Sequence, residues 1–165
     1  MIISGGSIIT ERGPEPADIL VEGDRITRSG PPGSFDGTDE VFDATGRWVL
    51  PGFVDVHTHF GMPLRPGLES LGWKESSSAA LLGGTTTVID FANPDAGEAL
   101  MAVADRWRSR ADGATLCDYG LHVTVTEPTA ERLAEIPALV AAGLPTIKGF
   151  LAYKGRLMLT PDQMK

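Results

Sequence analysis

The spacing of hydrophobic and polar positions changes once along the chain. Up to Leu50, short apolar runs alternate with polar residues and turn signals, and no helical spacing is found. The runs are IISGGSIIT at 2–10, ADILVEGDRITRSG at 17–30 and EVFDATGRWVL at 40–50. Gly23 and Asp24 lie between two alternating runs and predict a tight hairpin. This pattern predicts a small β unit over residues 1–50, interpreted as a β-sandwich segment.

From residue 51 to 165 the pattern changes to strands that alternate with helices. The predicted strands are GFVDVHTHF at 52–60, TTTVIDFA at 85–92, DYGLHVTVT at 118–126 and TIKGFLAY at 146–153. The predicted helices between them cover 68–84, 97–112 and 129–143. Strands separated by helices in this way predict parallel βαβ connections.

The third predicted helix has the clearest start and stop signals. Thr129 is a suitable N-cap residue, and Gly143 lies where a left-handed C-terminal residue is expected. The apolar stripe at helical spacing consists of Leu133, Ile136, Val140 and, less regularly, Leu139.

A parallel β/α array forms either an open doubly wound sheet or a closed eight-stranded barrel. The glycine fingerprint for phosphate binding, which favours the open form, is absent after the first predicted strand. A barrel typically needs about 250 residues, more than the 165 of this chain. The sequence therefore predicts an α/β fold, the N-terminal part of a (β/α)8 TIM barrel that is incomplete here. A four-stranded open sheet is the alternative.

Composition and charge exclude several classes of function. Lys and Arg total 14 against 22 for Asp and Glu, a formal charge of −8, and the basic residues are not clustered. Nucleic-acid binding is therefore not expected. No run approaches the roughly 20 apolar residues of a membrane span, so no membrane role is expected. The N-terminus lacks the pattern of a secretory signal, and Cys117 is the only cysteine, which favours a cytoplasmic location.

His57 and His59 are two of only three histidines in the chain. Side chains at i and i+2 of a strand emerge on the same face, and the pair lies at the end of the first barrel strand, where barrel enzymes assemble their sites. Imidazole is a common metal ligand. The alternative is a chance pair that caps a strand.

Lys148 and Tyr153 are the next candidates. Lys148 has apolar neighbours in a predicted buried strand, so it either extends to solvent at the strand end or has a functional role. In the functional interpretation its amine reacts with carbon dioxide to give a carbamate that bridges two metal ions. Tyr153 is expected on a loop, as an ordinary half-buried tyrosine or as a hydrogen-bond donor to an oxyanion. Asp55 is expected to orient one histidine, whereas Asp90 and His122 are expected to have supporting or core roles.

Several blocks together resemble the dihydropyrimidinase and hydantoinase branch of the metal-dependent amidohydrolases. These blocks are ATGRWVLPG, LPGFVDVHTHFGMP, GGTTTVIDFA, DYGLHV and IKGFLAYKG, in order and at similar spacing. The resemblance implies two divalent ions, most often zinc, bound by His57, His59 and a carboxylated Lys148. It implies that Tyr153 holds the substrate carbonyl. By position, Leu64, Phe150 and Leu157 are candidates to surround the substituent of the substrate ring.

The resemblance implies hydrolysis of a C–N bond in a small cyclic amide such as a dihydropyrimidine or hydantoin. Two adjacent metal ions lower the pKa of a shared water and polarise the amide oxygen. Members of the branch are commonly homotetramers. Alternatives are an allantoinase or dihydroorotase type of enzyme and a non-catalytic scaffold of the same fold.

Two departures from the family pattern limit the resemblance. The stretch GMPLRPGLESLGWKES at 61–76 differs in the loop that helps to build the substrate pocket, which leaves the identity of the ring open. No histidine follows His122, so the further histidine ligands and the aspartate general acid/base of the family are absent. The chain is therefore expected to be a fragment that is inactive alone.

Overall fold

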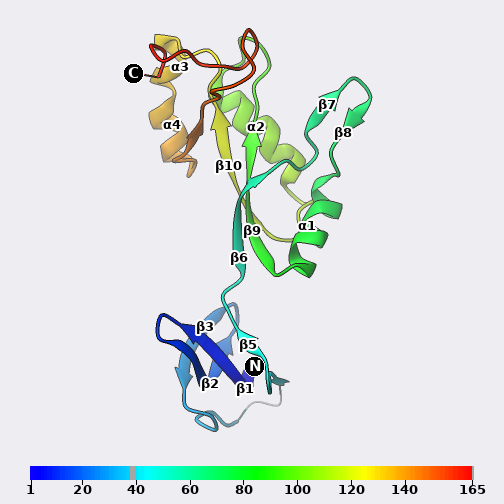
Figure 1. Cartoon of the computed structure of the whole chain (residues 1–165), viewed down its shortest axis with the longest axis vertical. Coiled ribbons are helices and arrows are strands. Elements are labelled where there is room, and N and C mark those ends of the chain that lie inside the picture. The colour runs from blue at the N-terminus through cyan, green and yellow to red at the C-terminus, as the bar shows by residue number, and fades with distance from the viewer. Residues whose placement is uncertain (38–39, 165) are drawn as a thin grey trace. The chain divides into compact units, whose positions relative to one another are not determined.

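The computed structural model describes residues 1–37 and 40–164. The chain divides into two compact units, Met1–Pro51 and Gly52–Lys165, and each is considered by itself (Figure 1). Within the described residues, no helix has both the length and the apolar character needed to cross a membrane.

The first unit contains one five-stranded sheet. Its strands are β1 (Ile2–Thr10), β2 (Gly13–Glu22), β3 (Arg25–Gly30), β4 (Val41–Asp43) and β5 (Trp48–Val49). The strand order is β3-β2-β1-β4, and β5 also pairs with β1. The predicted hairpin is confirmed, because Glu22 pairs with Arg25 and Gly23 adopts a φ of 61°. A second sheet packed on this one, as in a sandwich, stays a prediction.

Asp18 holds the centre of this sheet. Its carboxylate is buried and accepts hydrogen bonds from the Ser4 hydroxyl at 3.0 Å, the Gly5 amide at 3.0 Å and the Gly33 amide at 2.8 Å. The backbone bonds from Gly33 and Gly5 lower the pKa of Asp18, because they stabilise the charged form. One carboxylate therefore joins β1, β2 and the loop after β3.

The second unit is built on a four-stranded parallel sheet. Its strands are β6 (Phe53–Thr58), β9 (Thr85–Ala92), β10 (Asp118–Thr124) and β11 (Ile147–Lys148), in the order β11-β10-β9-β6. All three pairings are parallel, which confirms the predicted βαβ connections and the mixed α/β fold. The sheet corresponds to half of a barrel, and closure into eight strands stays a prediction.

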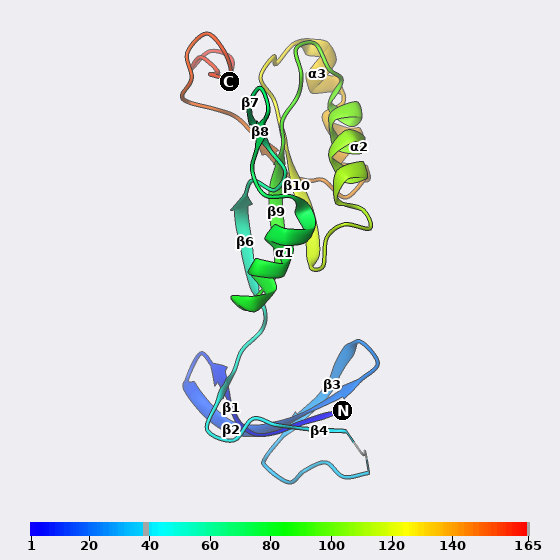
Figure 2. The same ribbon diagram turned by 90° about the vertical axis from the view of Figure 1, so that its right-hand side faces the viewer.

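Helices and sheet share one apolar core. The helices are α1 (Trp73–Leu82), α2 (Leu100–Ala111), α3 (Ala130–Ala134) and α4 (Ile136–Ala141), and α1 and α2 lie on one side of the sheet (Figure 2). The buried cluster comprises Trp73, Val88, Ala92, Leu100, Val103, Ala104, Trp107, Ala111, Leu121, Val123, Val125, Leu139 and Leu144. In β9 and β10 the members of the cluster alternate with residues of the opposite face, which is the face that carries the candidate site.

The first predicted helix begins later than expected. Residues 63–69 instead form a hairpin of β7 (Pro63–Arg65) and β8 (Leu68–Glu69), and α1 begins only at Trp73. Gly67 has a φ of 75° in the turn, a conformation that favours glycine. The prolines of this segment, which lack a backbone donor, oppose a helix here.

The third predicted helix is interrupted. Pro137 disfavours the helical conformation of the preceding residue, and the helix is divided into α3 and α4 around Glu135. The division shifts the apolar face, so Leu139 is fully buried while Leu133 and Val140 are exposed. The expected stripe is therefore wrong at Leu133 and Val140, whereas Ile136 and Leu139 pack against the core as predicted. The ends are as predicted, since Thr129 accepts a hydrogen bond from the Arg132 amide and Gly143 has a φ of 80°.

Candidate metal and substrate site

His57 and His59 lie at the end of β6, on the side of the sheet opposite the core. Residues paired across neighbouring strands share a face, and adjacent residues of one strand alternate between faces. Thr58 pairs with Asp90 of β9, which shares the parity of the core residue Val88, and Thr58 and Asp90 are both buried. The two histidines that flank Thr58 point the other way, and their ring centroids are 5.2 Å apart, edge to face.

The register of β10 and β11 brings Lys148 to the same face. Lys148 pairs with Thr124, and His122, two residues before Thr124, pairs with Phe91 of β9. Because Phe91 is adjacent to Asp90, its side chain lies on the face of the β6 histidines. Residues from four strands thus meet on one face of the sheet, although they are far apart in the sequence.

Phe91 is the ring that all of these basic side chains contact. Its centroid lies 4.6 Å from that of His57, 5.2 Å from that of His59 and 5.3 Å from that of His122. The Nζ atom of Lys148 lies 4.8 Å from the same centroid. The sequence analysis did not identify Phe91, because an apolar residue in a buried strand has no signal that separates it from the core.

The imidazole of His59 lies in an environment that suits a metal ligand. Its Nδ1 atom is buried and has no hydrogen-bond partner among the described residues. Burial lowers the pKa of His59, and the nearby positive charges of His57 and Lys148 lower it further. These effects favour the neutral imidazole, which is the form that binds a metal ion.

Asp90 fixes the turn that carries the two histidines. Its Oδ2 atom accepts from the Thr58 hydroxyl at 2.9 Å and from the Phe60 amide at 2.6 Å. Burial raises the pKa of Asp90 to about 6, although these bonds and one from the Phe91 amide oppose the shift. Asp90 therefore supports the site from the core side.

The other two polar residues also act through their neighbours. Asp55 accepts a hydrogen bond from the backbone amide of His57 at 3.0 Å, so it holds the strand end rather than the imidazole ring. His122 uses both ring nitrogens, with Nδ1 2.7 Å from the Thr146 hydroxyl and Nε2 3.1 Å from the Val56 carbonyl oxygen. His122 thus links β10 to β6 and to the segment before β11.

Tyr153 lies on the loop after β11, in a tight turn. It is the only described residue other than glycine with a positive φ, 65°, which is uncommon and is found at functional sites. Its carbonyl oxygen accepts from the amides of Arg156 at 3.0 Å and Leu157 at 3.1 Å. Its ring packs edge to face on Phe150 at 5.7 Å.

A cavity of about 420 Å³ brings the predicted substrate residues together with one predicted metal ligand. His59, Leu64, Phe150, Tyr153 and Leu157 all line it. Met62 and Pro63 belong to the stretch 61–76 that was expected to help build the pocket. The sequence analysis missed the other walls, which are Asn93, Pro94, Asp95, Arg106, Trp107 and Arg156. The size is within the range of small-molecule sites.

Asn93, at the end of β9, organises the wall beside Met62. Its side-chain oxygen accepts from the buried Thr124 hydroxyl at 2.8 Å, and its side-chain nitrogen is 3.7 Å from the Met62 sulfur. Its carbonyl oxygen accepts from the Arg106 guanidinium at 2.9 Å and the Trp107 indole at 3.1 Å. Strand and helix α2 therefore hold this wall in place.

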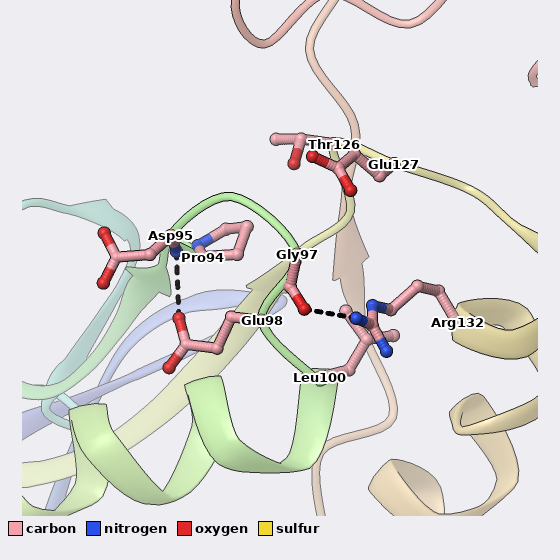
Figure 3. A pocket seen from close by; sticks show the side chains of 8 residues that line it. All are labelled: Pro94, Asp95, Gly97, Glu98, Leu100, Thr126, Glu127 and Arg132. Atoms are coloured by element: carbon pink, nitrogen blue, oxygen red, sulfur yellow. Dashed lines mark hydrogen bonds between the residues drawn. The ribbon is translucent and has the colours of Figure 1, made fainter.

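The loop that follows Asn93 is held from both sides. Arg106 donates to both carboxylate oxygens of Glu98, at 2.9 and 2.6 Å, and Glu98 accepts from the Asp95 amide at 2.9 Å. On the other side the Arg132 guanidinium donates to the Gly97 carbonyl oxygen (Figure 3). These contacts fix the loop that bounds the cavity.

The donor set supports part of a metal site. In residues 1–37 and 40–164, no three His, Cys, Asp or Glu side chains lie close enough together to hold a metal ion. Two imidazoles and Lys148 are present instead, and a carbamate on the Lys148 nitrogen would offer oxygen atoms as metal ligands. The unsatisfied buried nitrogen of His59 fits a ligand role. The residues therefore fit one side of a metal centre.

Comparison with known proteins agrees with this geometry. The sequence profile of the amidohydrolase family matches residues 48–150, which include β6, β9, β10 and Lys148. The chain belongs to the amidohydrolase family. This family is metal-dependent.

Among members of the amidohydrolase family, the chain is similar to dihydropyrimidinases and D-hydantoinases. It is 39% identical to dihydropyrimidinase 1 of Caenorhabditis briggsae, with 99% of this chain and 34% of the relative covered. It is 35% identical to a D-hydantoinase of Rhizobium radiobacter, with coverage of 96% and 34%. The crystal structure of dihydropyrimidinase from Brevibacillus agri matches with a TM-score of 0.91 and 34% identity, with coverage of 99% and 35%. The chain thus spans about a third of the length of these relatives.

Proposed function

We propose that this chain supplies part of the active site of a cyclic amidohydrolase that opens a dihydropyrimidine or hydantoin ring by hydrolysis of an amide C–N bond. The observation that carries the proposal is that His59, Tyr153 and the apolar residues Leu64, Phe150 and Leu157 all line the same cavity. Because the chain spans about a third of its relatives, the activity is proposed for a protein that also contains the remaining two thirds.

His57, His59 and a carboxylated Lys148 are the proposed metal ligands. Their common contact with Phe91 and the lowered pKa of His59 support this assignment. When bound, two divalent ions, proposed to be zinc, supply Lewis acidity for the attack of water on the amide. The resemblance also supports a homotetramer as the assembly.

Lys148 is placed well for conversion to a carbamate. Its side chain is partly buried beside the β6 histidines, and carbon dioxide reacts with the neutral form of an amine. The Phe91 and Phe150 rings, at 4.8 and 5.0 Å from Nζ, restrict where the head of the side chain can lie.

Tyr153 and the apolar walls are proposed to position the ring. The phenol of Tyr153 lines the cavity and can donate a hydrogen bond to the substrate carbonyl oxygen, which becomes more negative as the amide is attacked. Leu64, Phe150 and Leu157 are proposed to contact the ring substituent. Tyr153 packs on Phe150, so the proposed hydrogen-bond donor and one of the apolar residues are in direct contact.

The test uses a protein that contains this chain together with the remaining two thirds of the family length, produced with zinc and bicarbonate. Ring opening of dihydrouracil and of unsubstituted hydantoin is followed by loss of substrate, and ¹³C-bicarbonate incorporation at Lys148 is followed by NMR. His59→Ala and Lys148→Ala should abolish ring opening and lower zinc content. Lys154→Ala is the control and should do neither, because Lys154 follows Tyr153 on the loop after β11 but does not line the cavity. A fully active Lys148→Ala variant would refute the proposed role of this residue.

A further inference from the structure

The cavity beside His59 shares its rim with a second hollow of similar size. The second hollow also measures about 420 Å³ and is bounded by the β7–β8 hairpin, residues 63–69, and by Arg156. Arg156 and Leu64 line both spaces. A group attached to a ligand in the first cavity can therefore extend past Arg156 into the second.

The carboxylates at this rim are already paired. Glu69, which lines the second hollow, lies 3.3 Å from Arg110, and Asp95, which lines the first cavity, lies 3.7 Å from Arg106. Each carboxylate therefore has a guanidinium partner that is not Arg156.

Two arginines at the rim have no such partner. Across the part of the chain that the structure describes, neither Arg65 nor Arg156 forms a salt bridge or a side-chain hydrogen bond. The chain as a whole carries a net charge of −8, so this hollow is locally positive on a chain that is negative overall.

The turn that presents Arg156 is the turn that presents Tyr153. The amide of Arg156 donates to the Tyr153 carbonyl oxygen at 3.0 Å, and the amide of Leu157 donates to the same atom at 3.1 Å. Arg156 is thus part of the same hydrogen-bonded turn as Tyr153, beside the cavity proposed to hold the substrate. A guanidinium presents a planar fork of donors that matches a carboxylate.

We propose that Arg156 recognises a carboxylate on the substituent of the cyclic amide, and that Arg65 adds positive charge to the hollow that receives it. This assignment rests on the proposed function and specifies its substrate class as rings with an anionic side arm. Leu64 and Leu157 pack the apolar stem of that arm, and Arg156 binds its charged end.

The experiment compares two hydantoins in the longer, zinc-loaded protein, one with a carboxyethyl substituent and one with the corresponding carboxamide. Arg156→Gln should lower kcat/KM for the acid by about tenfold or more, the usual effect of losing a hydrogen bond to a charged group. The same variant should change kcat/KM for the amide by less than about twofold, because that ring lacks the charge. Arg65→Gln should lower the acid rate by a smaller factor.

Lys154→Gln is the matched control. It removes one positive charge from the same loop, but Lys154 lines neither space, so the ratio of the two rates should stay at the wild-type value. Two results would overturn the anion proposal and leave the proposed function standing. One is an equal loss of kcat/KM for the acid and the amide in Arg156→Gln, and the other is an equal effect of Arg156→Gln and Lys154→Gln on kcat/KM for the acid.

Binding measurements separate the two proposals further. If the wild-type protein opens neither ring, the proposed function fails, and calorimetric binding of the two compounds still tests Arg156. Tighter binding of the acid that is lost in Arg156→Gln supports the site. Equal binding of acid and amide overturns it.

Discussion

The Nζ atom of Lys148 lies 4.8 Å from the centre of the Phe91 ring, and the same ring contacts His57 and His59. A residue without any polar atom in its side chain is thus the common neighbour of the three proposed metal ligands. Phe91 is 4% exposed, so its ring has little freedom to move. The distances between the ligands depend on a packed aromatic group in addition to the backbone.

Phe91→Leu should weaken zinc binding more than it weakens folding. Leucine fills much of the space but cannot reproduce the ring contacts with the imidazoles, whereas Phe91→Ala should lose about 3–5 kcal/mol of unfolding free energy. Zinc affinity from competition with a chelator and unfolding in urea measure the two effects. Phe35→Leu, in the first unit, is the control and should leave zinc affinity unchanged. Unaltered affinity in Phe91→Leu would show that the ring only fills space.

Asp90 should make the protein less stable as the pH rises. Its pKa is about 6 in the folded chain against 3.8 unfolded, so between these values the folded state binds more protons than the unfolded state. The favourable contribution of protonated Asp90 to the free energy of unfolding is complete below pH 3.8 and is lost as the pH rises through 6. Relative to Asp90→Asn, the wild type should lose on the order of 2 kcal/mol of unfolding free energy between pH 4 and 7. Urea unfolding of both metal-free proteins measures this, and parallel pH curves would contradict it.

Asp18 should show the opposite pH dependence. Backbone hydrogen bonds from Gly33 and Gly5 keep its folded pKa below 3.8, so its contribution is present above pH 3.8 and is lost as the pH falls through the folded pKa. Asp18→Asn should be less stable than the wild type at pH 7, and the difference should shrink in acid. Asp24→Asn, an exposed hairpin substitution, is the control for acid unfolding followed by circular dichroism. A difference that grows in acid would rule this out.

The apolar residues of β6 should promote self-association of the 165-residue chain. Val54 is 57% and Val56 56% exposed on a strand at the edge of the sheet, where unpaired backbone groups are also available. The double substitution Val54→Thr with Val56→Thr should reduce association in light-scattering measurements without loss of strand propensity. Ile26→Thr, at a 69% exposed site of the first unit, should have a smaller effect. An equal effect of both changes would argue against a special role for the β6 edge.

Local sequence patterns predicted the elements that rely on short-range chemistry. The hairpin at Gly23, the cap at Thr129 and the left-handed residue at Gly143 need only a few neighbouring residues, and all three are found. Two helices were misjudged where prolines and a glycine turn override an apolar spacing, at the β7–β8 hairpin and at Pro137. Propensity over a window does not show which of these competing local preferences prevails.

By itself, the sequence determined the alternation of strands and helices, the two histidines of β6 and the resemblance to one family, because periodicity and motif spacing lie within continuous segments. Only the tertiary structure decided that Lys148 shares a face with those histidines and that Phe91 contacts all of them. It also decided that Arg156 lines the cavity beside His59, where it has no carboxylate partner among the described residues. The physical reason is that strand register and side-chain packing join residues separated by tens of positions. No local pattern encodes which face, which ring or which charge they meet.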